Sequence, residues 1–354
     1  MFSGIGGFEL GIEKAIRFNE SLLERCKDSR NIKRRRRYCK PHCVGFSEID
    51  KYSIQTYTKH FPTHKNYGDA FKINPTDLPD FEMLCGGFPC QSFSIAGKRK
   101  GFQDIRGTLF HEICRILQSK RPGLVFLENV KGLLSADNGR CFATILTSLD
   151  ELGYDVEWQV LNSKHFGVPQ NRERVFIIGH LRGTGGRQIF PIRENDKIID
   201  DTTPKFQREI STEETANCLT GRYYKMAPTD TYISYARRDK SQHSRVYNTH
   251  GISPTLAGDC TPKITIPVLT PDRLEKRQNG RRFKEDGEEM FTLNTQDKHG
   301  IYDGKTIRRL TPTECERLQG YPDGWTEGVS DTQRYKQLGN AVTVNVIEAI
   351  ARRL

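Results

Sequence analysis

A single cysteine lies where an α/β protein can place a nucleophile. Cys90, in "GFPCQSFS", comes directly after an apolar run and next to Pro89. If that run is a strand of a parallel sheet, Cys90 lies on a loop at the carboxyl edge of the sheet, where open α/β folds bind their ligands. A cysteine in such a loop is either a nucleophile or an inert thiol, and this stretch alone does not separate the two.

An acid is expected at the same edge, and two arginines begin a later strand. Glu128 ends the apolar run "GLVFLEN", and Arg172 and Arg174 alternate at the start of "RERVFIIG". Alternate residues of a strand project to one face, so the two arginines would point the same way. The alternatives are an ordinary exposed acid and solvated charges at a sheet edge.

A glycine-rich turn opens the chain. Gly4, Gly6 and Gly7 in "MFSGIGGFELG" precede apolar residues at helical spacing, which predicts a tight turn leading into a helix. A dinucleotide site has the pattern G-x-G-x-x-G, whose backbone approaches a pyrophosphate. Here Glu9 stands where the third glycine would be. The turn therefore favours a cofactor without phosphate.

Strand-like and helical runs alternate along residues 44–180, which indicates an α/β fold. Helical spacing marks residues 107–118 and 141–153, the second ended by Gly153. This alternation predicts a mostly parallel sheet with helices on both faces. The strand-like runs are residues 44–49, 81–85, 123–129, 156–161 and 174–179.

The remainder divides into an irregular and a regular part. Residues 183–305 are polar with short strand-like pieces, which predicts a second domain or a large insertion. Leu219, Leu256 and Leu293 recur at equal spacing there, a hint of repeated β-hairpins. In "LTPTECERLQG" a capping box and a proline begin a helix that Gly320 ends. The last stretch, "GNAVTVNVIEAIARRL", predicts a terminal helix on the first domain's core.

Charge and composition limit the class of protein. The 354 residues hold 55 Lys and Arg against 44 Asp and Glu, a net charge of +11 that suits a polyanionic partner. The basic run at residues 33–37 contacts phosphates or is a solvated loop. No apolar run is long enough to span a membrane and no secretory signal is present, so we expect a soluble, cytoplasmic protein.

The ten cysteines are scattered and predict reduced thiols rather than disulfides. Two of them, Cys85 and Cys114, lie inside apolar runs, where a buried thiol is usual. One group of potential metal ligands occurs, but its spacing matches no zinc pattern, so no metal is predicted. The group comprises Cys26, Cys39, His42 and Cys43.

In their order and spacing, these stretches resemble the C5-cytosine-specific DNA methyltransferases of bacterial or phage restriction-modification type. The resemblance covers residues 1–18, 44–180 and 306–354. The motifs that carry it are "FSGIGG", "SEIDKY", "GDA", "GGFPCQSFS", "GKRKGFQDIRGTLF", "LENVKGLL", "QNRERVFIIG", "RRLTPTECERLQGYPDGW" and "QLGNAVTVNV".

The resemblance implies a Rossmann-like fold dependent on S-adenosylmethionine, with a smaller, irregular DNA-recognition domain. Duplex DNA would lie between the domains, with one cytosine flipped into a pocket. It further implies a monomer and functional pairing with a cognate restriction endonuclease. The expected divisions are residues 1–182 for catalysis and cofactor binding, completed by the helix at 331–354, residues 183–305 for target recognition, and residues 306–330 as a connecting motif.

The resemblance also implies roles for individual residues. Cys90 is the nucleophile, Glu128 contacts the ring nitrogen and exocyclic amine of the cytosine, and Arg174, with Arg172 nearby, orients the base. The cofactor turn comprises Phe2, Gly4, Gly6 and Gly7. Glu48 binds the ribose hydroxyls, Ile49 and Asp69 hold the adenine, and Leu109, Asn340 and Val342 complete that pocket.

The chemistry accounts for the catalytic residue types. Carbon 5 of cytosine is a poor nucleophile, so a thiolate first adds to carbon 6 and gives carbon 5 enamine character. A protonated Glu128 can neutralise the charge that develops at nitrogen 3 if burial raises its pKa. Arg174 at the carbonyl oxygen adds electrostatic stabilisation. The base that removes the proton from carbon 5 is not identified by the sequence, and water can serve.

Two other functions are compatible with the same motifs. A relative that methylates tRNA has the same fold. The roughly 120 residues between "QNRERVFIIG" and "RRLTPTECERLQGYPDGW" suit a DNA-reading domain and favour DNA over RNA as the substrate. A DNA-binding paralogue without activity is disfavoured by the intact Cys90, Glu128 and Arg174.

Only Met1 and Phe2 precede the glycine turn. In the family a buried strand leads into it. We therefore expect that Met1 is not the natural start and that upstream codons supply an apolar strand. Another segment in its place, or an inactive copy, is the alternative.

Overall fold

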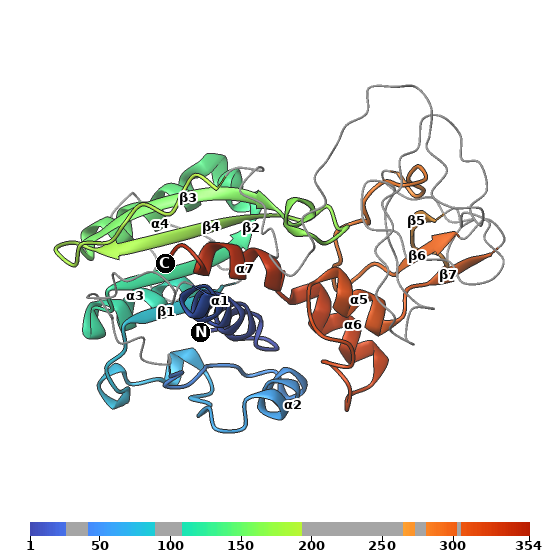
Figure 1. Ribbon diagram of the computed structural model, residues 1–354. Helices are drawn as coiled ribbons and strands as arrows, with labels where there is room; N and C mark the ends of the chain where they lie inside the picture. Colours follow the sequence, from blue (N-terminus) through green and yellow to red (C-terminus); the bar gives the residue numbers. More distant parts are fainter. Residues whose placement is uncertain (26–41, 89–107, 193–264, 273–280, 303–305) are drawn as a thin grey trace.

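A central sheet organises the larger part of the molecule (Figure 1). The computed structural model of the protein describes residues 1–25, 42–88, 108–192, 265–272, 281–302 and 306–354. Within these residues the sheet has four strands in the order β1 (Met83–Gly87), β2 (Leu124–Val130), β4 (Glu173–Leu181) and β3 (Tyr154–Asn162).

The strand directions differ from the mostly parallel sheet that the sequence predicts. β1 pairs with β2 in parallel, whereas β4 is antiparallel to both of its neighbours, β2 and β3. The reason is the link from Asn162 to Glu173, which is too short for the helical crossover that a parallel pair requires. As a consequence, β4 begins at the edge where β1 and β2 end.

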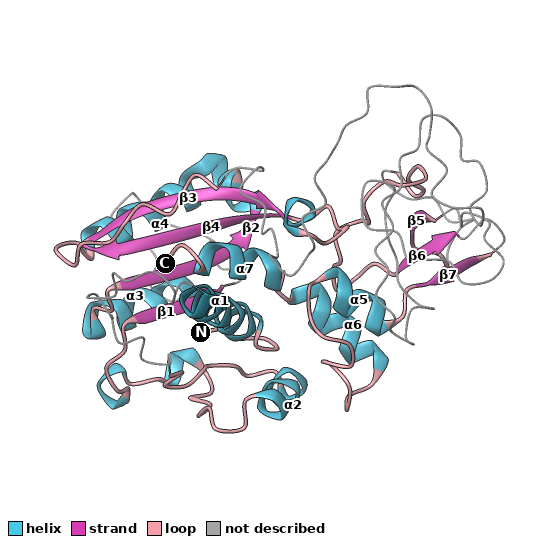
Figure 2. Ribbon diagram, viewed as in Figure 1, coloured by secondary structure: helices cyan, strands magenta, loops and turns pink. Residues whose placement is uncertain are grey.

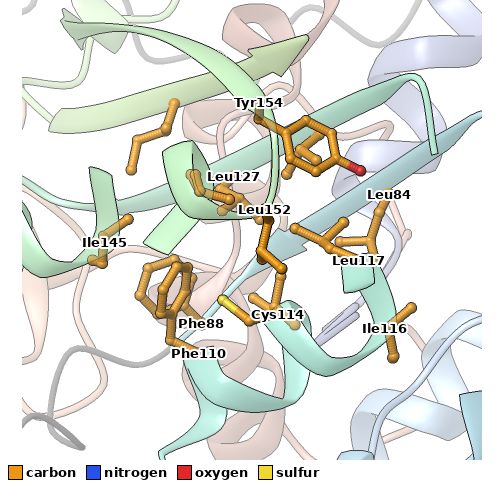
Figure 3. Close-up of a cluster of buried hydrophobic side chains, with 14 of the residues drawn as sticks. Leu84, Phe88, Phe110, Cys114, Ile116, Leu117, Leu127, Ile145, Leu152 and Tyr154 are labelled. Atoms are coloured by element: carbon orange, nitrogen blue, oxygen red, sulfur yellow. The ribbon is translucent and has the colours of Figure 1, made fainter. Parts of the chain in front are cut away.

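Helices cover both faces of this sheet, as expected (Figure 2). Val125 and Leu127 of β2 pack in one cluster with α3 (Leu109–Lys120) and α4 (Arg140–Glu151), part of which Figure 3 shows. Phe126, on the opposite face, packs in another cluster with α1 (Gly7–Arg25) and α7 (Val344–Ala351). Alternation along β2 therefore places the first and last described helices together.

The predicted helices form close to their expected bounds. The Thr108 side chain accepts from the His111 N–H and begins α3, a capping interaction that the sequence analysis did not single out. Gly153, which the sequence marks as the stop of α4, has a φ of +90° two residues after the helix ends. Such a φ favours glycine because it has no Cβ.

The predicted strand at residues 44–49 does not form. Phe46 makes only an isolated parallel bridge to Asn66 before α2 (Lys51–His60) begins. The first residues of the chain lie between this segment and β1, since the Met1 amino group donates to the Cys85 carbonyl and the Ser3 N–H to the Ser47 carbonyl. The proposed upstream strand stays a prediction.

The second part of the described chain contains a small antiparallel sheet. It comprises β5 (Ile266–Leu269), β6 (His299–Tyr302) and β7 (Ile307–Arg309). Next to it lie α5 (Pro312–Leu318) and α6 (Asp331–Asn340) (Figure 1). Most of residues 183–305, including Leu219 and Leu256, lies outside the described residues, so the predicted repeat is not tested.

The C-terminal elements follow the sequence in part. The capping box of Thr311 and Glu314 forms, with Pro312 at the first helical position of α5. The predicted single terminal helix is instead two, because α6 ends at Asn340 and α7 begins at Val344. The Ala341 carbonyl between them accepts from Arg172, which fixes the break.

The described part of the chain has no helix that is both long and apolar enough to cross a membrane. Its cysteines are free thiols. Cys114 is buried as expected, whereas Cys85 is only partly buried. Of the potential metal ligands in the sequence, His42 and Cys43 are described, whereas Cys26 and Cys39 lie outside the described residues. The basic run at 33–37 also lies outside them.

Candidate active site

An acid and an arginine meet at the edge where β1 and β2 end. Glu128, near the end of β2, lies opposite Gly87 of β1 and Phe176 of β4. Arg174 approaches from the start of β4, and its Nε lies 3.1 Å from Glu128 Oε1. The antiparallel direction of β4 produces this pair, because it brings the beginning of one strand to the end of another.

Burial sets the protonation state of the acid. Glu128 is only 9% exposed, and this desolvation raises its pKa above the ordinary value. The positive charges of Arg174 and then Arg172 oppose the shift without reversing it. The site therefore holds a carboxyl group that keeps its proton more readily than a surface glutamate does.

Asn129, which follows Glu128, fixes the chain that leads to Cys90. Its Nδ2 donates to the Phe88 carbonyl at 2.8 Å, and its Oδ1 accepts from the Val130 N–H at 2.9 Å. Phe88 is the last described residue before Cys90, and Cys90 itself lies outside the described residues. Asn129 was not predicted from the sequence, although an amide that directly follows an acid at a strand end could have indicated its role.

Arg172 is buried and donates hydrogen bonds to backbone carbonyls. It is 2% exposed, and its guanidinium donates to the carbonyls of Leu293 at 2.7 Å, Gly339 at 3.1 Å and Ala341 at 2.7 Å. Arg174, by contrast, faces Glu128. The two arginines that the sequence places on one face therefore have different partners.

Gln170, two residues before Arg172, also connects this stretch to the C-terminal part of the chain, and it was not predicted from the sequence. Its side chain donates to the Leu318 carbonyl at 2.8 Å and accepts from the Leu293 N–H at 3.0 Å. It is fully buried. Together with Arg172 it ties the beginning of β4 to the second part of the chain.

The glycine turn and Glu48 form one site. Glu48 Oε2 accepts from the Gly4 N–H at 2.9 Å, and Oε1 accepts from the N–H groups of Ile49 at 2.9 Å and Asp50 at 3.0 Å. A Cβ on Gly4 would meet no atom within 4 Å, so open space lies beside the carboxylate. Gly4 has a φ of +55°, which favours glycine.

Apolar and polar groups flank this open space. Ile49, next to Glu48 in the chain, is 73% exposed, so its apolar side chain is accessible to a ligand. Asn66 exchanges hydrogen bonds with the Glu48 backbone and accepts from the Gly68 N–H, so it holds Asp69 near Glu48. The Asp69 carboxylate accepts from the Phe71 N–H at 3.1 Å.

The other predicted cofactor residues come from different parts of the chain. Val342 lies against the turn, since a Cβ on Gly7 would come within 2.6 Å of its Cγ2. Asn340, exposed at the end of α6, lies between the two carbonyls that Arg172 holds. Leu109 begins α3, and Phe2 is half-buried with a φ of +54°. Gly6 lies against Phe61.

Comparison with known proteins decides the family. The model of the C-5 cytosine-specific DNA methylases matches residues 1–354. The chain belongs to this family. It is accordingly a DNA (cytosine-5-)-methyltransferase, as the order of its motifs predicts.

Relatives support the assignment along the full length. The chain is 34% identical over 400 residues to the "Orphan methyltransferase M.SPRI" of Bacillus phage SPR, covering 88% of this chain and 91% of that protein. It is 33% identical over 356 residues to the "Type II methyltransferase M.HhaI" of Haemophilus parahaemolyticus, covering 99% and 91%. Among solved structures, a putative DNA modification methyltransferase from an E. coli prophage matches with a TM-score of 0.55 at 18% identity, covering 99% and 96%, which shows a shared fold.

Proposed function

We propose that this methyltransferase moves a methyl group from S-adenosylmethionine to carbon 5 of a cytosine flipped out of duplex DNA, through a covalent bond to Cys90. The observation that carries the proposal is the buried Glu128 paired with Arg174 at the edge from which the chain leaves toward Cys90. Such an edge is where an α/β sheet holds a ligand.

The catalytic residues divide the work on the base. The Cys90 thiolate adds to carbon 6, forming a carbon–sulfur bond and placing electron density on carbon 5. Glu128, whose raised pKa favours the protonated form, donates to nitrogen 3 as charge develops there. Arg174 reaches the carbonyl oxygen of the ring. Once carbon 5 has taken the methyl group, loss of its proton to a base and return of the nitrogen 3 proton to Glu128 restore the ring and expel the Cys90 thiolate.

The glycine-turn site fits the methyl donor. S-adenosylmethionine, when bound, supplies a methyl group activated by its positively charged sulfur. The open space at Gly4 accommodates a ribose against the Glu48 carboxylate, whose position three backbone N–H groups fix. Ile49 and Phe2 offer apolar faces to the adenine, with Asp69, Leu109, Asn340 and Val342 around it.

Arg172 acts as a positioning residue in this proposal. Its three carbonyl partners leave it engaged within the protein, two of them flanking Asn340 and one, that of Leu293, on the segment between β5 and β6. Since Arg172 is two residues from Arg174, it links the position of the base-contacting arginine to that of the cofactor pocket.

Duplex DNA is the proposed partner. The net charge of +11 suits a polyanion, and phosphate contacts make such binding strongly salt-dependent. We assign residues 183–305 to target recognition, residues 1–182 with 331–354 to catalysis, and 306–330 to the connection. A monomer, a cytoplasmic location and functional pairing with an endonuclease remain predictions.

A methyl-transfer assay tests the proposed reaction. Purified protein is incubated with tritiated S-adenosylmethionine and either duplex DNA of mixed sequence or total tRNA, and the product nucleosides are separated by chromatography. We expect label in 5-methyldeoxycytidine from DNA only. Label confined to the tRNA, or label in another nucleoside, contradicts the proposal.

Cofactor binding is tested separately with S-adenosylhomocysteine by calorimetry. Glu48→Gln removes the charge that the ribose hydroxyls meet, so the dissociation constant should rise by about tenfold, the effect of one charge-assisted hydrogen bond. Glu13→Gln is the matched control, since Glu13 pairs with Arg17 on the surface of α1. Equal affinity in both variants contradicts the assignment of Glu48.

A further inference from the structure

We propose that Trp325 is a positioning residue for the cofactor turn and sets the affinity for S-adenosylmethionine from a loop 320 residues downstream. The inference rests on the proposed cofactor site at Gly4 and Glu48. It concerns the loop between α5 and α6, which belongs to the predicted connecting motif at residues 306–330.

The contact is a single buried hydrogen bond. The Trp325 indole Nε1–H donates to the carbonyl of Ile5 at 2.9 Å, and Ile5 is the middle residue of the turn Gly4-Ile5-Gly6. Both residues are buried, Ile5 being 2% and Trp325 6% exposed. Water therefore cannot replace the donor, and the bond fixes the orientation of the Ile5–Gly6 peptide.

The ring of Trp325 is itself held firmly. His60, the last residue of α2, stacks on it at 3.6 Å with an interplanar angle of 6°. The Nε2 of His60 also contacts the Trp325 carbonyl at 2.7 Å. One side chain from α2 thus orients both the ring and the backbone of Trp325.

The backbone on either side of Trp325 is anchored by a buried acid. Glu316 of α5 is fully buried, and its carboxylate accepts from the N–H groups of Gly324 at 2.7 Å and Thr326 at 2.8 Å. Arg334 of α6 pairs with the same carboxylate at 3.1 Å. The indole N–H is therefore aimed from a loop whose own position is fixed on both sides.

The turn has little room to move away from this contact. A Cβ on Gly6 would come within 2.6 Å of the Phe61 ring, and one on Gly7 within 2.3 Å of the Tyr321 hydroxyl. The turn is thus packed on its inner side and open only at Gly4, toward Glu48. A change in the Ile5–Gly6 peptide would pass to the Gly4 N–H, which Glu48 accepts, and so to the cofactor site.

The chain has only two tryptophans, which provides a matched pair of variants. Trp325→Phe keeps an aromatic ring for His60 to stack on and removes the N–H. Trp158→Phe is the control, since Trp158 lies on β3, is 44% exposed and packs against Phe142 rather than the turn.

The readout separates positioning from general instability. For each variant we would measure KM for S-adenosylmethionine, KM for DNA, kcat, and the dissociation constant of S-adenosylhomocysteine. Trp325→Phe should raise the two cofactor constants about tenfold, the equivalent of one hydrogen bond, with KM for DNA within about twofold of the parent. Partial unfolding alone would lower kcat and leave both KM values unchanged. A lower kcat with both KM values unchanged, or an equal rise in both KM values, overturns the proposal.

A milder variant guards against a Trp325→Phe protein that does not fold. His60→Leu, at the half-buried end of α2, removes the stacked ring and the contact to the Trp325 carbonyl but leaves the indole N–H in place. It should raise the cofactor KM about threefold, with KM for DNA unaltered. An unchanged cofactor KM contradicts the proposal. If the parent protein itself binds no S-adenosylhomocysteine, the result contradicts the proposal that S-adenosylmethionine is the cofactor, rather than the role of Trp325.

Discussion

Glu128 shows how a single side chain is prepared for its task by its surroundings. Its carboxyl group is desolvated, which raises its pKa, while Arg174 at 3.1 Å limits that shift. Burial without the arginine would raise the pKa of the carboxyl further, and exposure would leave a carboxyl that is ionised near neutral pH. The pair therefore suits a group that donates a proton in the reaction.

Glu128→Gln tests this interpretation through activity. The amide keeps the shape of the side chain but has no proton to give, so we expect kcat to fall by about 10²–10⁴-fold, the usual contribution of a general acid. Binding of S-adenosylhomocysteine should stay unchanged. A variant with near-parental kcat would contradict the role of Glu128.

The same substitution has a pH-dependent effect on stability. A carboxyl whose pKa is raised on folding stabilises the protein below its unfolded value of 4.5, and that contribution is lost as pH rises through the folded pKa. Glutamine does not titrate. The melting temperature of Glu128→Gln relative to the parent should therefore be higher at pH 8 than at pH 5, measured by differential scanning fluorimetry. A difference that is constant with pH, or that falls, argues against a raised pKa.

At the scale of elements, the direction of β4 decides the site. The sequence places Glu128 at a strand end and Arg174 at a strand start, which a parallel sheet would put at opposite edges. The antiparallel β4 brings them together, with Val130 opposite Arg174 in the register. The apolar run that forms β4 is readable from the sequence, but its direction depends on the short link from β3 and on tertiary pairing.

Local sequence signals predicted some elements correctly, whereas contacts with distant residues changed others. The α3 and α4 helices and the α5 capping box follow from local spacing and capping residues, which the sequence states directly. The strand expected at residues 44–49 and the single terminal helix do not form, because the backbone of these segments bonds to distant residues. Phe46 bonds to Lys65 and Tyr67, and Ala341 to Arg172.

Arg172→Lys tests the joint between elements. A lysine presents a compact ammonium rather than a planar fork, so at least two of the three buried carbonyls should lose their donor. At ~1–3 kcal/mol for each unsatisfied group, the free energy of unfolding should fall by ~2–6 kcal/mol. Chemical denaturation measures this directly.

The control for that experiment is Thr311→Ala, which removes only the capping box of α5. It should cost about 1 kcal/mol and leave KM for the cofactor unchanged. Arg172→Lys should in addition raise KM for the cofactor, since two of its carbonyls flank Asn340. A loss no greater than that of Thr311→Ala would show that Arg172 does not hold these elements together.

At the scale of the whole molecule, the two ends of the described chain build one core. α1 and α7 pack together against the sheet, and the loop after α5 reaches the glycine turn. Residues 183–305 are inserted between β4 and these C-terminal elements. In the proposed division, the catalytic part is therefore built from segments on both sides of this region.

Exchange of residues 183–305 for the corresponding region of a relative tests this division. The chimaera should methylate the relative's DNA sequence with kcat within about tenfold of the parent, since specificity comes from a few base contacts. Bisulfite sequencing of DNA from cells that express it gives the readout. An unaltered target sequence would contradict the assignment of this region to recognition.

The most direct test of the account is covalent capture of the protein on DNA with 5-fluorocytosine at the target position. Fluorine cannot leave as a proton, so after methyl transfer the bond between Cys90 and carbon 6 should persist. We expect a complex that survives denaturing electrophoresis, requires S-adenosylmethionine and carries the nucleotide on the peptide that contains Cys90. The Cys90→Ala protein should bind the DNA without forming the complex. Methylation of ordinary DNA by Cys90→Ala, or capture through another residue, would contradict the proposed mechanism.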